Sequence, residues 1–278
     1  MVAACRIALA VLLAALVCGC STVRFAYENA DAYARWKVGT YLDLEGDDAE
    51  LLDERIEEFH AWHRRNELPK YVTLAREAAQ RFADGLSHPD LVWGYDSLRT
   101  QAKESLRKAA ELLAPILDRL SPAQVAQIER RIAEDNRQFY RERLRGSESE
   151  RRERRANYAV NRLEDWVGKL TPVQVQRVRE YSRRAPLVDE LRDGDRKRLQ
   201  KEVMAIVRAR QAKARLAERV AQWELGRDPA YLAALEAWRE HYFSMLLDVD
   251  RMLTPEQRAR ALGHMRRYAE DFETLSAR

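Results

Sequence analysis

The sequence predicts an all-α protein, a bundle of long helices and helical hairpins with no sheet. Charged residues make up 34% of the 278 residues, whereas only ten residues are glycine and eight are proline. No segment alternates apolar and polar residues as a half-buried strand does. Several segments instead repeat apolar residues every three or four positions, and many of them open with Ser, Thr or Asp followed by Pro.

The first nineteen residues are typical of an export signal. Arg6 is their single charge, and residues 7–17 form an apolar run too short to cross a bilayer as a helix. The run leads into Val-Cys-Gly-Cys at residues 17–20, which resembles the bacterial lipobox, whose last cysteine is lipidated. We therefore expect a lipoprotein signal peptide over residues 1–19 and lipidation at Cys20. An uncleaved anchor and an ordinary secretory signal are the alternatives.

This signal predicts the compartment and limits the chemistry. Ser21 follows the cysteine as in lipoproteins sorted to the outer membrane, so we expect an outer-membrane lipoprotein that faces the periplasm of a Gram-negative bacterium. Its membrane contact would be the N-terminal lipid. All three cysteines lie in the first twenty residues, which leaves no thiol for disulfides, catalysis or metal binding. Residues 20–278 would form the helical domain, with a possible sub-boundary near residue 120.

Start and stop signals divide the N-terminal half into helices. A segment rich in aromatic residues comes first. Acidic residues open the next helix, which Pro69 interrupts. Ser87 caps a third helix, whose last turns Pro115 bends, and a fourth ends before Gly146. We expect these helices over residues 23–40, 47–85, 87–120 and 122–144.

The C-terminal half shows the same signals. A return helix follows Gly146, and a short helix ends before Pro186. A long helix closes at Gly226, and Asp228 caps a helix with a regular apolar seam. We expect these helices, and a last one, over residues 149–169, 172–183, 189–225, 229–252 and 255–275.

Three helix starts share one motif: Leu, Ser or Thr, Pro, any residue, Gln. The hydroxyl can cap the helix, Pro suits its first position, and Gln can reach back to the N–H of the cap. This pattern resembles that of the Spy/CpxP-like periplasmic chaperones, and the resemblance implies a chaperone-like activity. Capping alone is the alternative explanation. The copies are Leu120, Ser121, Pro122 and Gln124; Leu170, Thr171, Pro172 and Gln174; and Leu253, Thr254, Pro255 and Gln257.

One helix carries acidic and histidine residues at helical spacing. Glu57 and His60 match half of a carboxylate-bridged di-metal site, which needs a second Glu-x-x-His on a facing helix. The sequence offers no second copy, so we expect no metal site and no cofactor. A metal-binding protein that uses Glu57, His60 and His63 is the less favoured alternative.

The bend at Pro69 is the most specific feature of the N-terminal half. Proline removes a helix donor, and bends expose carbonyl groups that Arg or Tyr can bond. We take His63, Arg64, Glu67 and Tyr71 as candidate binding residues around this bend. A hinge held by its own side chains is the alternative.

A strongly basic segment lies in the predicted helix 189–225. Residues 196–219 carry nine Lys or Arg against two Glu. Such a helix can attract anionic lipid, lipopolysaccharide phosphates or an acidic partner, and the candidate binding residues are Arg208, Arg210, Lys213 and Arg215. A solvated face is the alternative. The scarcity of aromatic residues in the segment argues against nucleic acid as a partner.

The segments Tyr27–Asp31, Tyr41–Leu44 and His63–Tyr71 resemble an uncharacterised proteobacterial lipoprotein family, a domain of unknown function. The resemblance implies localisation and fold but supplies no catalytic residues. The chain also lacks a Gly-rich phosphate loop, a Gly-x-Ser-x-Gly elbow and a His-Glu-x-x-His motif. We therefore expect a non-enzymatic module that binds a protein partner or an unfolded client. An envelope-assembly scaffold is the alternative.

Overall fold

The computed structural model describes residues 22–278, which form helices and no strand, so the all-α prediction is confirmed. The predicted signal peptide and Cys20 lie outside the described residues. The helices of the first half are α2 (Thr22–Glu28), α3 (Ala30–Gly39), α4 (Asp47–Asn66), α5 (Leu68–Ala83), α6 (His88–Leu117) and α7 (Pro122–Phe139). A π-helical turn, Tyr140–Leu144, extends α7.

The second half begins after a turn in which Gly146 has a φ of +98°, the left-handed region that favours glycine. Its helices are α8 (Glu148–Val167), α9 (Pro172–Arg184), α10 (Asp189–Arg208), α11 (Ala212–Ala221), α12 (Pro229–Arg251) and α13 (Pro255–Ser276). Within residues 22–278, no helix combines the length and the apolar character needed to cross a membrane.

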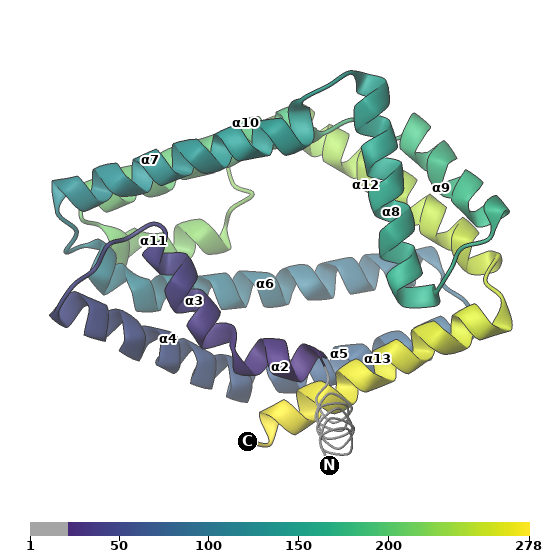
Figure 1. The fold of residues 1–278 in the computed structure, drawn as a ribbon, viewed down its shortest axis with the longest axis horizontal. Helices are drawn as coiled ribbons and strands as arrows, with labels where there is room; N and C mark the ends of the chain where they lie inside the picture. Colours follow the sequence, from purple (N-terminus) through teal and green to yellow (C-terminus); the bar gives the residue numbers. More distant parts are fainter. Residues whose placement is uncertain (1–21) are drawn as a thin grey trace, which may run out of the picture.

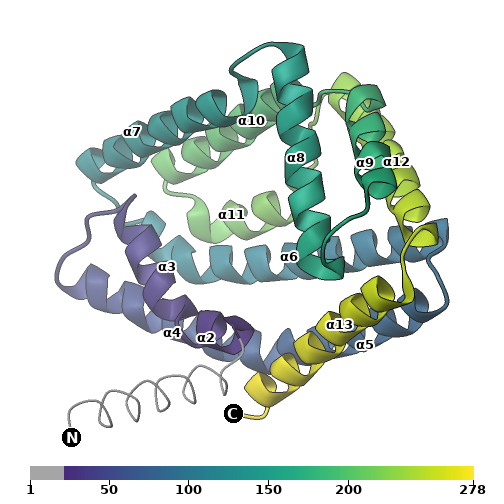
Figure 2. The same ribbon diagram turned by 45° about the vertical axis from the view of Figure 1, so that its right-hand side comes forward.

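The helices are arranged like the sides of a frame. In both views α7 and α10 lie side by side along one edge, and α5 and α13 along the opposite edge (Figures 1 and 2). The long helix α6 runs between these edges, and α8, α9 and α12 form one end of the frame. Since α13 packs along α5, the end of the chain returns to its N-terminal half and closes the arrangement.

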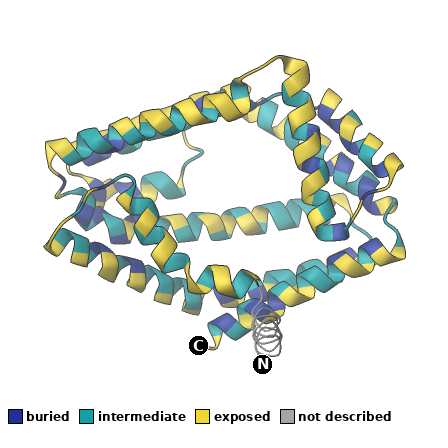
Figure 3. Ribbon diagram, viewed as in Figure 1, coloured by how far each residue is buried: buried dark blue, intermediate teal, exposed yellow. Residues whose placement is uncertain are grey.

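The apolar core is divided among the corners of this frame. The largest cluster joins α5, α8, α9, α12 and α13 around Val178, Met245 and Leu170. A second cluster places Leu42 and Leu120 against Met204 and neighbouring side chains of α7 and α10. Buried residues gather where helices meet, while exposed residues follow the outer sides (Figure 3). The helix faces between the corners are therefore less completely covered by other helices.

The prediction of one continuous helix over residues 189–225 is wrong, because the structure breaks the helix at residues 209–211. Arg210 adopts a φ of +53°, unusual for a residue other than glycine. The carboxylate of Asp118 then caps α11 from another part of the chain, accepting hydrogen bonds from the backbone N of Ala212 (2.7 Å) and Lys213 (3.1 Å). This cap lies more than ninety residues away in sequence, so local patterning could not show it.

Two smaller boundaries also differ from the prediction. The helix expected over residues 23–40 is divided at Asn29, whose side chain donates to the carbonyl of Phe25 at 2.8 Å. The helix expected from residue 149 begins at Glu148, with Ser147 as its N-cap. The predicted interruption near Pro69 is confirmed, since α4 ends at Asn66 and α5 begins at Leu68.

Candidate functional site

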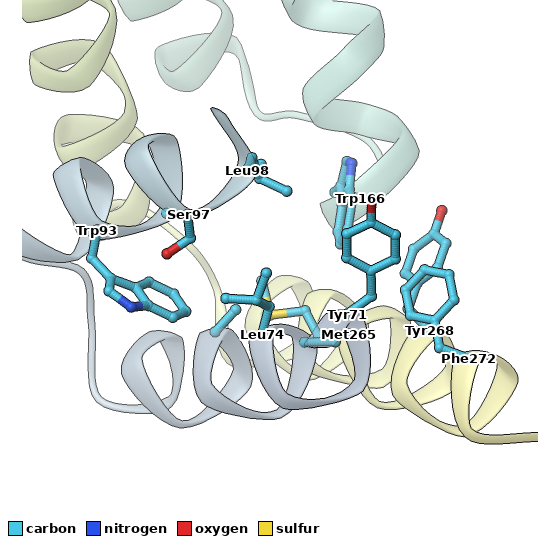
Figure 4. Close-up of a pocket in the computed structure, with 12 residues that line it drawn as sticks. Tyr71, Leu74, Trp93, Ser97, Leu98, Trp166, Met265, Tyr268 and Phe272 are labelled. Atoms are coloured by element: carbon cyan, nitrogen blue, oxygen red, sulfur yellow. The ribbon is translucent and has the colours of Figure 1, made fainter. Parts of the chain in front are cut away.

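An apolar groove lies where α5 and α13 face α6 and the end of α8. Its volume is about 420 Å³, a size that holds a small ligand or several side chains of a partner. Each of the four helices supplies large apolar or aromatic side chains to it (Figure 4). The most prominent are Tyr71, Trp93, Leu98, Trp166, Tyr268 and Phe272.

Small residues make room for the groove. Ala75 and Ala78 line it from α5, and Gly94 lines it from α6. A Cβ built on Gly94 would have no atom within 4 Å, so a side chain at this position would project into open space. Leu98, one turn further along α6, is 64% exposed. A large apolar side chain is seldom left this open within an apolar groove unless something covers it.

The polar groups of the groove lie at its edges, with the Ser97 hydroxyl near Trp93 and the tyrosine hydroxyls at the other end (Figure 4). The hydroxyls of Tyr71 and Tyr268 point away from Leu74 and Met265, which leaves an apolar floor (Figure 4). Burial raises the pKa of Tyr71, so its phenol stays protonated at neutral pH. The flexible thioether of Met265 can adapt to differently shaped apolar partners.

Charged side chains around the groove are paired with side chains of opposite charge. The Arg81 guanidinium lies 4.4 Å from the centroid of the Trp93 ring and is paired with Glu77 and Asp90. These contacts hold Trp93 in place through a cation–π interaction. On the seam between α5 and α13, Arg76 pairs with Glu273 at 2.7 Å. The rim therefore has little net charge, and an apolar ligand is favoured over a strongly charged one.

A row of contacting rings connects the groove with α2. The Tyr71 ring contacts His63 (centroids 5.6 Å apart), and His63 in turn contacts Tyr27 (5.7 Å). On the other side, Tyr71 contacts Phe272, which stacks on Tyr268. The Tyr27 hydroxyl also lies 3.0 Å from His63 Nδ1. Burial, with a smaller effect of nearby His60, lowers the pKa of His63 to about 4, so this ring is neutral in the folded protein at neutral pH.

The candidate binding residues around Pro69 have separate places. Tyr71 lines the groove, and His63 lies behind it. Glu67 is fully buried and accepts a hydrogen bond from Lys70 Nζ at 2.7 Å. The Arg64 guanidinium lies 6.0 Å from the centroid of the Tyr27 ring. The bend thus brings His63 and Tyr71 together, while Glu67 and Arg64 lie outside the groove.

The residues of the alternative metal site make contacts within the protein. Glu57 accepts a hydrogen bond from Arg35 Nη2 at 3.2 Å, and His60 Nε2 lies 3.1 Å from the carbonyl oxygen of Tyr27. His63 Nδ1 faces the Tyr27 hydroxyl. Over residues 22–278 no three His, Cys, Asp or Glu side chains are placed to hold one ion.

The three motif copies connect helices to one another. In each copy the hydroxyl and the glutamine close a capping box. Gln174 and Gln257 then bond each other reciprocally, with Nε2–Oε1 distances of 2.8 and 3.1 Å. Gln124 instead donates to the carbonyl of Asp43 at 3.1 Å. The glutamines therefore bond to distant parts of the chain and, in the two buried copies, present little surface to a client.

The basic residues do not form one helical face. Arg208 ends α10 and pairs with Glu129, Arg210 lies in the turn, and Lys213 and Arg215 begin α11. The prediction of a continuous basic helix is wrong, because the Asp118 cap starts a new helix in the middle of the segment.

Most residues of the groove do not stand out in the sequence. Its signal was present as apolar and small residues at helical spacing, such as Met265, Tyr268 and Phe272 on one face of α13. The same spacing is found on faces that fill the core, as in α12. Only the placement of four separate helices distinguishes the open face from the buried one.

Comparison with known proteins gives one family. The model of a family of unknown function (DUF6279) matches residues 40–226, which include the groove residues of α5, α6 and α8. The groove residues of α13 follow the matched region. No curated protein and no solved structure matches the chain.

Proposed function

The chain belongs to this family of unknown function, DUF6279, and we propose that it is a non-enzymatic, lipid-anchored envelope protein that binds apolar segments of other proteins in its groove, as a chaperone-like module. The groove between α5, α6, α8 and α13 carries this proposal. It is open, almost entirely apolar and built on helices rather than on loops.

The chemistry of the rim favours a polypeptide as the occupant. Apolar side chains of a client can enter beside Ala75, Ala78 and Gly94, where the lining is smallest. The paired charges around Trp93 and along the seam with α13 match the mixed charges of a protein segment. A lipid with an anionic headgroup would instead require a rim with excess positive charge.

The N-terminal helices support a position close to a membrane. Helix α2 begins two residues after Cys20, the predicted lipidation site. Phe25, Tyr33 and Trp36 on α2 and α3 are more than 60% exposed. Aromatic side chains of this kind suit the interface between lipid and water. Replacing Cys20 by Ala should abolish labelling with radioactive palmitate and leave the precursor unprocessed; labelling of the variant would refute the anchor.

The binding proposal is tested by filling the groove. Gly94→Leu places a side chain in the groove and also improves the helix propensity of α6, by about 0.5–1 kcal/mol. We therefore expect a variant at least as stable as the wild type that fails to slow aggregation of a chemically denatured client. Gly194→Leu is the matched control, since Gly194 lies in α10 and its Cβ also meets open space.

The wild type and Gly194→Leu should suppress client aggregation at near-equimolar ratio. Two results would contradict the proposal: no suppression by the wild type at large excess, or equal suppression by Gly94→Leu. Recovery of one stable envelope partner by the wild type, lost in Gly94→Leu, would assign the groove to a scaffold instead of a chaperone.

A further inference from the structure

A second cavity lies beside the turn at Gly146, away from the groove. It has a volume of about 610 Å³, and residues of α8, α9, α10 and α12 line it. Helices α8, α9 and α12 lie next to one another at this end of the molecule (Figure 2). Unlike the groove, this cavity combines aromatic rings with arginine side chains, so it suits a different ligand.

The inner wall of the cavity is aromatic. The rings of Trp238 and Tyr242 are stacked, with centroids 5.5 Å apart and an interplanar angle of 8°. Tyr181 meets Tyr242 edge-on at 5.7 Å. Tyr158 lies at the outer side and is 62% exposed. These faces can stack on a flat base or on the C–H face of a sugar ring.

Tyr181 of α9 borders the cavity with a largely buried phenol, whose hydroxyl also bonds with Trp238. Tyr181 is 2% exposed, and burial raises its pKa to about 12. Its phenol is therefore protonated over the whole physiological range. The Arg155 guanidinium lies 5.5 Å from the centroid of the Tyr181 ring, and Arg192 lines the same cavity.

Positive charge exceeds negative charge around the cavity. The lining includes six arginines and two carboxylates: Arg143, Arg151, Arg154, Arg155, Arg162 and Arg192, with Glu142 and Asp189. Some of this charge is compensated. Arg151 is paired with Glu190 through two hydrogen bonds, and the charges of Glu150 and Arg154 attract each other. Two arginines have only distant carboxylate partners: Arg162 lies 3.7 Å from Asp165, and Arg192 lies 4.0 Å from Asp189.

Arg155 is the most deeply placed of these charges. Its Nε donates to the Ser182 hydroxyl (3.3 Å), and its Nη1 donates to the carbonyl of Pro186 (2.7 Å). Its Nη2 donates to the carbonyls of Ser182 and Ala185, so no carboxylate is among its acceptors and one N–H of Nη1 is left. Desolvation by burial lowers its pKa, with a contribution from neighbouring Arg152. The carbonyl groups at the end of α9 carry partial negative charge, but none of the hydrogen-bond acceptors of Arg155 carries a full negative charge. An anion in the cavity would supply it.

We propose that this cavity binds an organic phosphate, with the phosphate beside Arg155, Arg192 and the Tyr181 hydroxyl and with its ring on the aromatic wall of Trp238 and Tyr242. The fork of Arg192 can match phosphate oxygens through paired hydrogen bonds, while Arg155 adds its charge and its remaining Nη1 N–H. Arg162 lines the same cavity with a largely exposed side chain, so it can reach the ring of the ligand. The site is separate from the groove, so neither proposal depends on the other.

The test uses titration calorimetry with four probes: glucose 1-phosphate, adenosine monophosphate, glucose and inorganic phosphate. We expect at least one of the two organic phosphates to bind at least tenfold more tightly than glucose or inorganic phosphate. The tighter of the two identifies the ring as a sugar or a base. No binding of either organic phosphate, or equal binding of inorganic phosphate, would overturn the proposal.

Arg192→Gln removes one charge without disturbing the carbonyl contacts of Arg155. We expect it to weaken the organic phosphate tenfold or more. Arg179→Gln is the matched control, since Arg179 is an exposed residue of α9 outside the cavity. Both variants should keep the helical circular dichroism of the wild type. Equal affinity of Arg192→Gln and Arg179→Gln would refute the assigned phosphate position.

Discussion

Replacing Gln257 by Ala tests the buried contact that joins two helix starts. Its side chain donates to the carbonyl of Lys169 (2.9 Å) and to Gln174 Oε1 (3.1 Å), and accepts from the backbone N of Thr254 (3.1 Å). Gln174 is fully buried and Gln257 is 7% exposed. Each buried polar group left unpaired costs about 1–3 kcal/mol, so we expect Gln257→Ala to lower the free energy of unfolding by about 3–4 kcal/mol.

Gln124 is a matched control within the same motif. It closes the same capping box and makes one further hydrogen bond, to Asp43, but it lies in a more exposed position. Gln124→Ala should therefore cost only about 1 kcal/mol. Urea unfolding followed by circular dichroism measures both losses, provided that the slope against urea is unchanged.

The reciprocal bonds also predict non-additivity. Once Gln257 is removed, the loss of Gln174 costs less, because their mutual hydrogen bonds are already gone. The double variant should lose at least 1 kcal/mol less than the sum of the two single variants. Additive losses, or equal losses for Gln124→Ala and Gln257→Ala, would show that the motif acts by capping alone.

Three further predictions concern other parts of the fold. Because the pKa of His63 is lowered to about 4, the unfolded chain binds a proton between pH 6.5 and about 4 that the folded chain does not. The free energy of unfolding should therefore be highest above pH 6.5 and fall by about 2 kcal/mol toward pH 4, with allowance for partial exposure of the ring. His63→Phe should flatten this pH dependence in urea titrations. Arg210→Gly should raise the melting temperature, because glycine adopts the φ of +53° without the cost of about 1 kcal/mol that arginine bears; a lower melting temperature would contradict this. Asp118→Ala should lower the free energy of unfolding by about 1–2 kcal/mol through loss of the cap on Ala212 and Lys213, and unchanged hydrogen exchange in α11 would count against that cap.

The groove and the arginine cavity differ in how far the sequence indicated them. Tyr71 was a candidate residue, because Pro69 marked its bend. The sequence predicts a helix end at Gly146 and a return helix after it, but gives no sign of the cavity beside this turn. Its walls come from residues as far apart as Arg143 and Tyr242. No spacing rule connects such positions, since their proximity depends on how the helices cross.

The sequence by itself determined the fold class and most helix boundaries. A hydroxyl, a proline and a glutamine within five residues are enough to start a helix, because capping is local. Only the tertiary structure decided which helix ends meet, as Gln174 and Gln257 do, and where Asp118 breaks a predicted helix. It also decided which apolar residues stay open: Met245 of α12 is buried in the core, whereas Met265 of α13 borders the groove. The physical reason is that burial depends on the surfaces of several helices together, whereas caps and periodicity depend on one segment at a time.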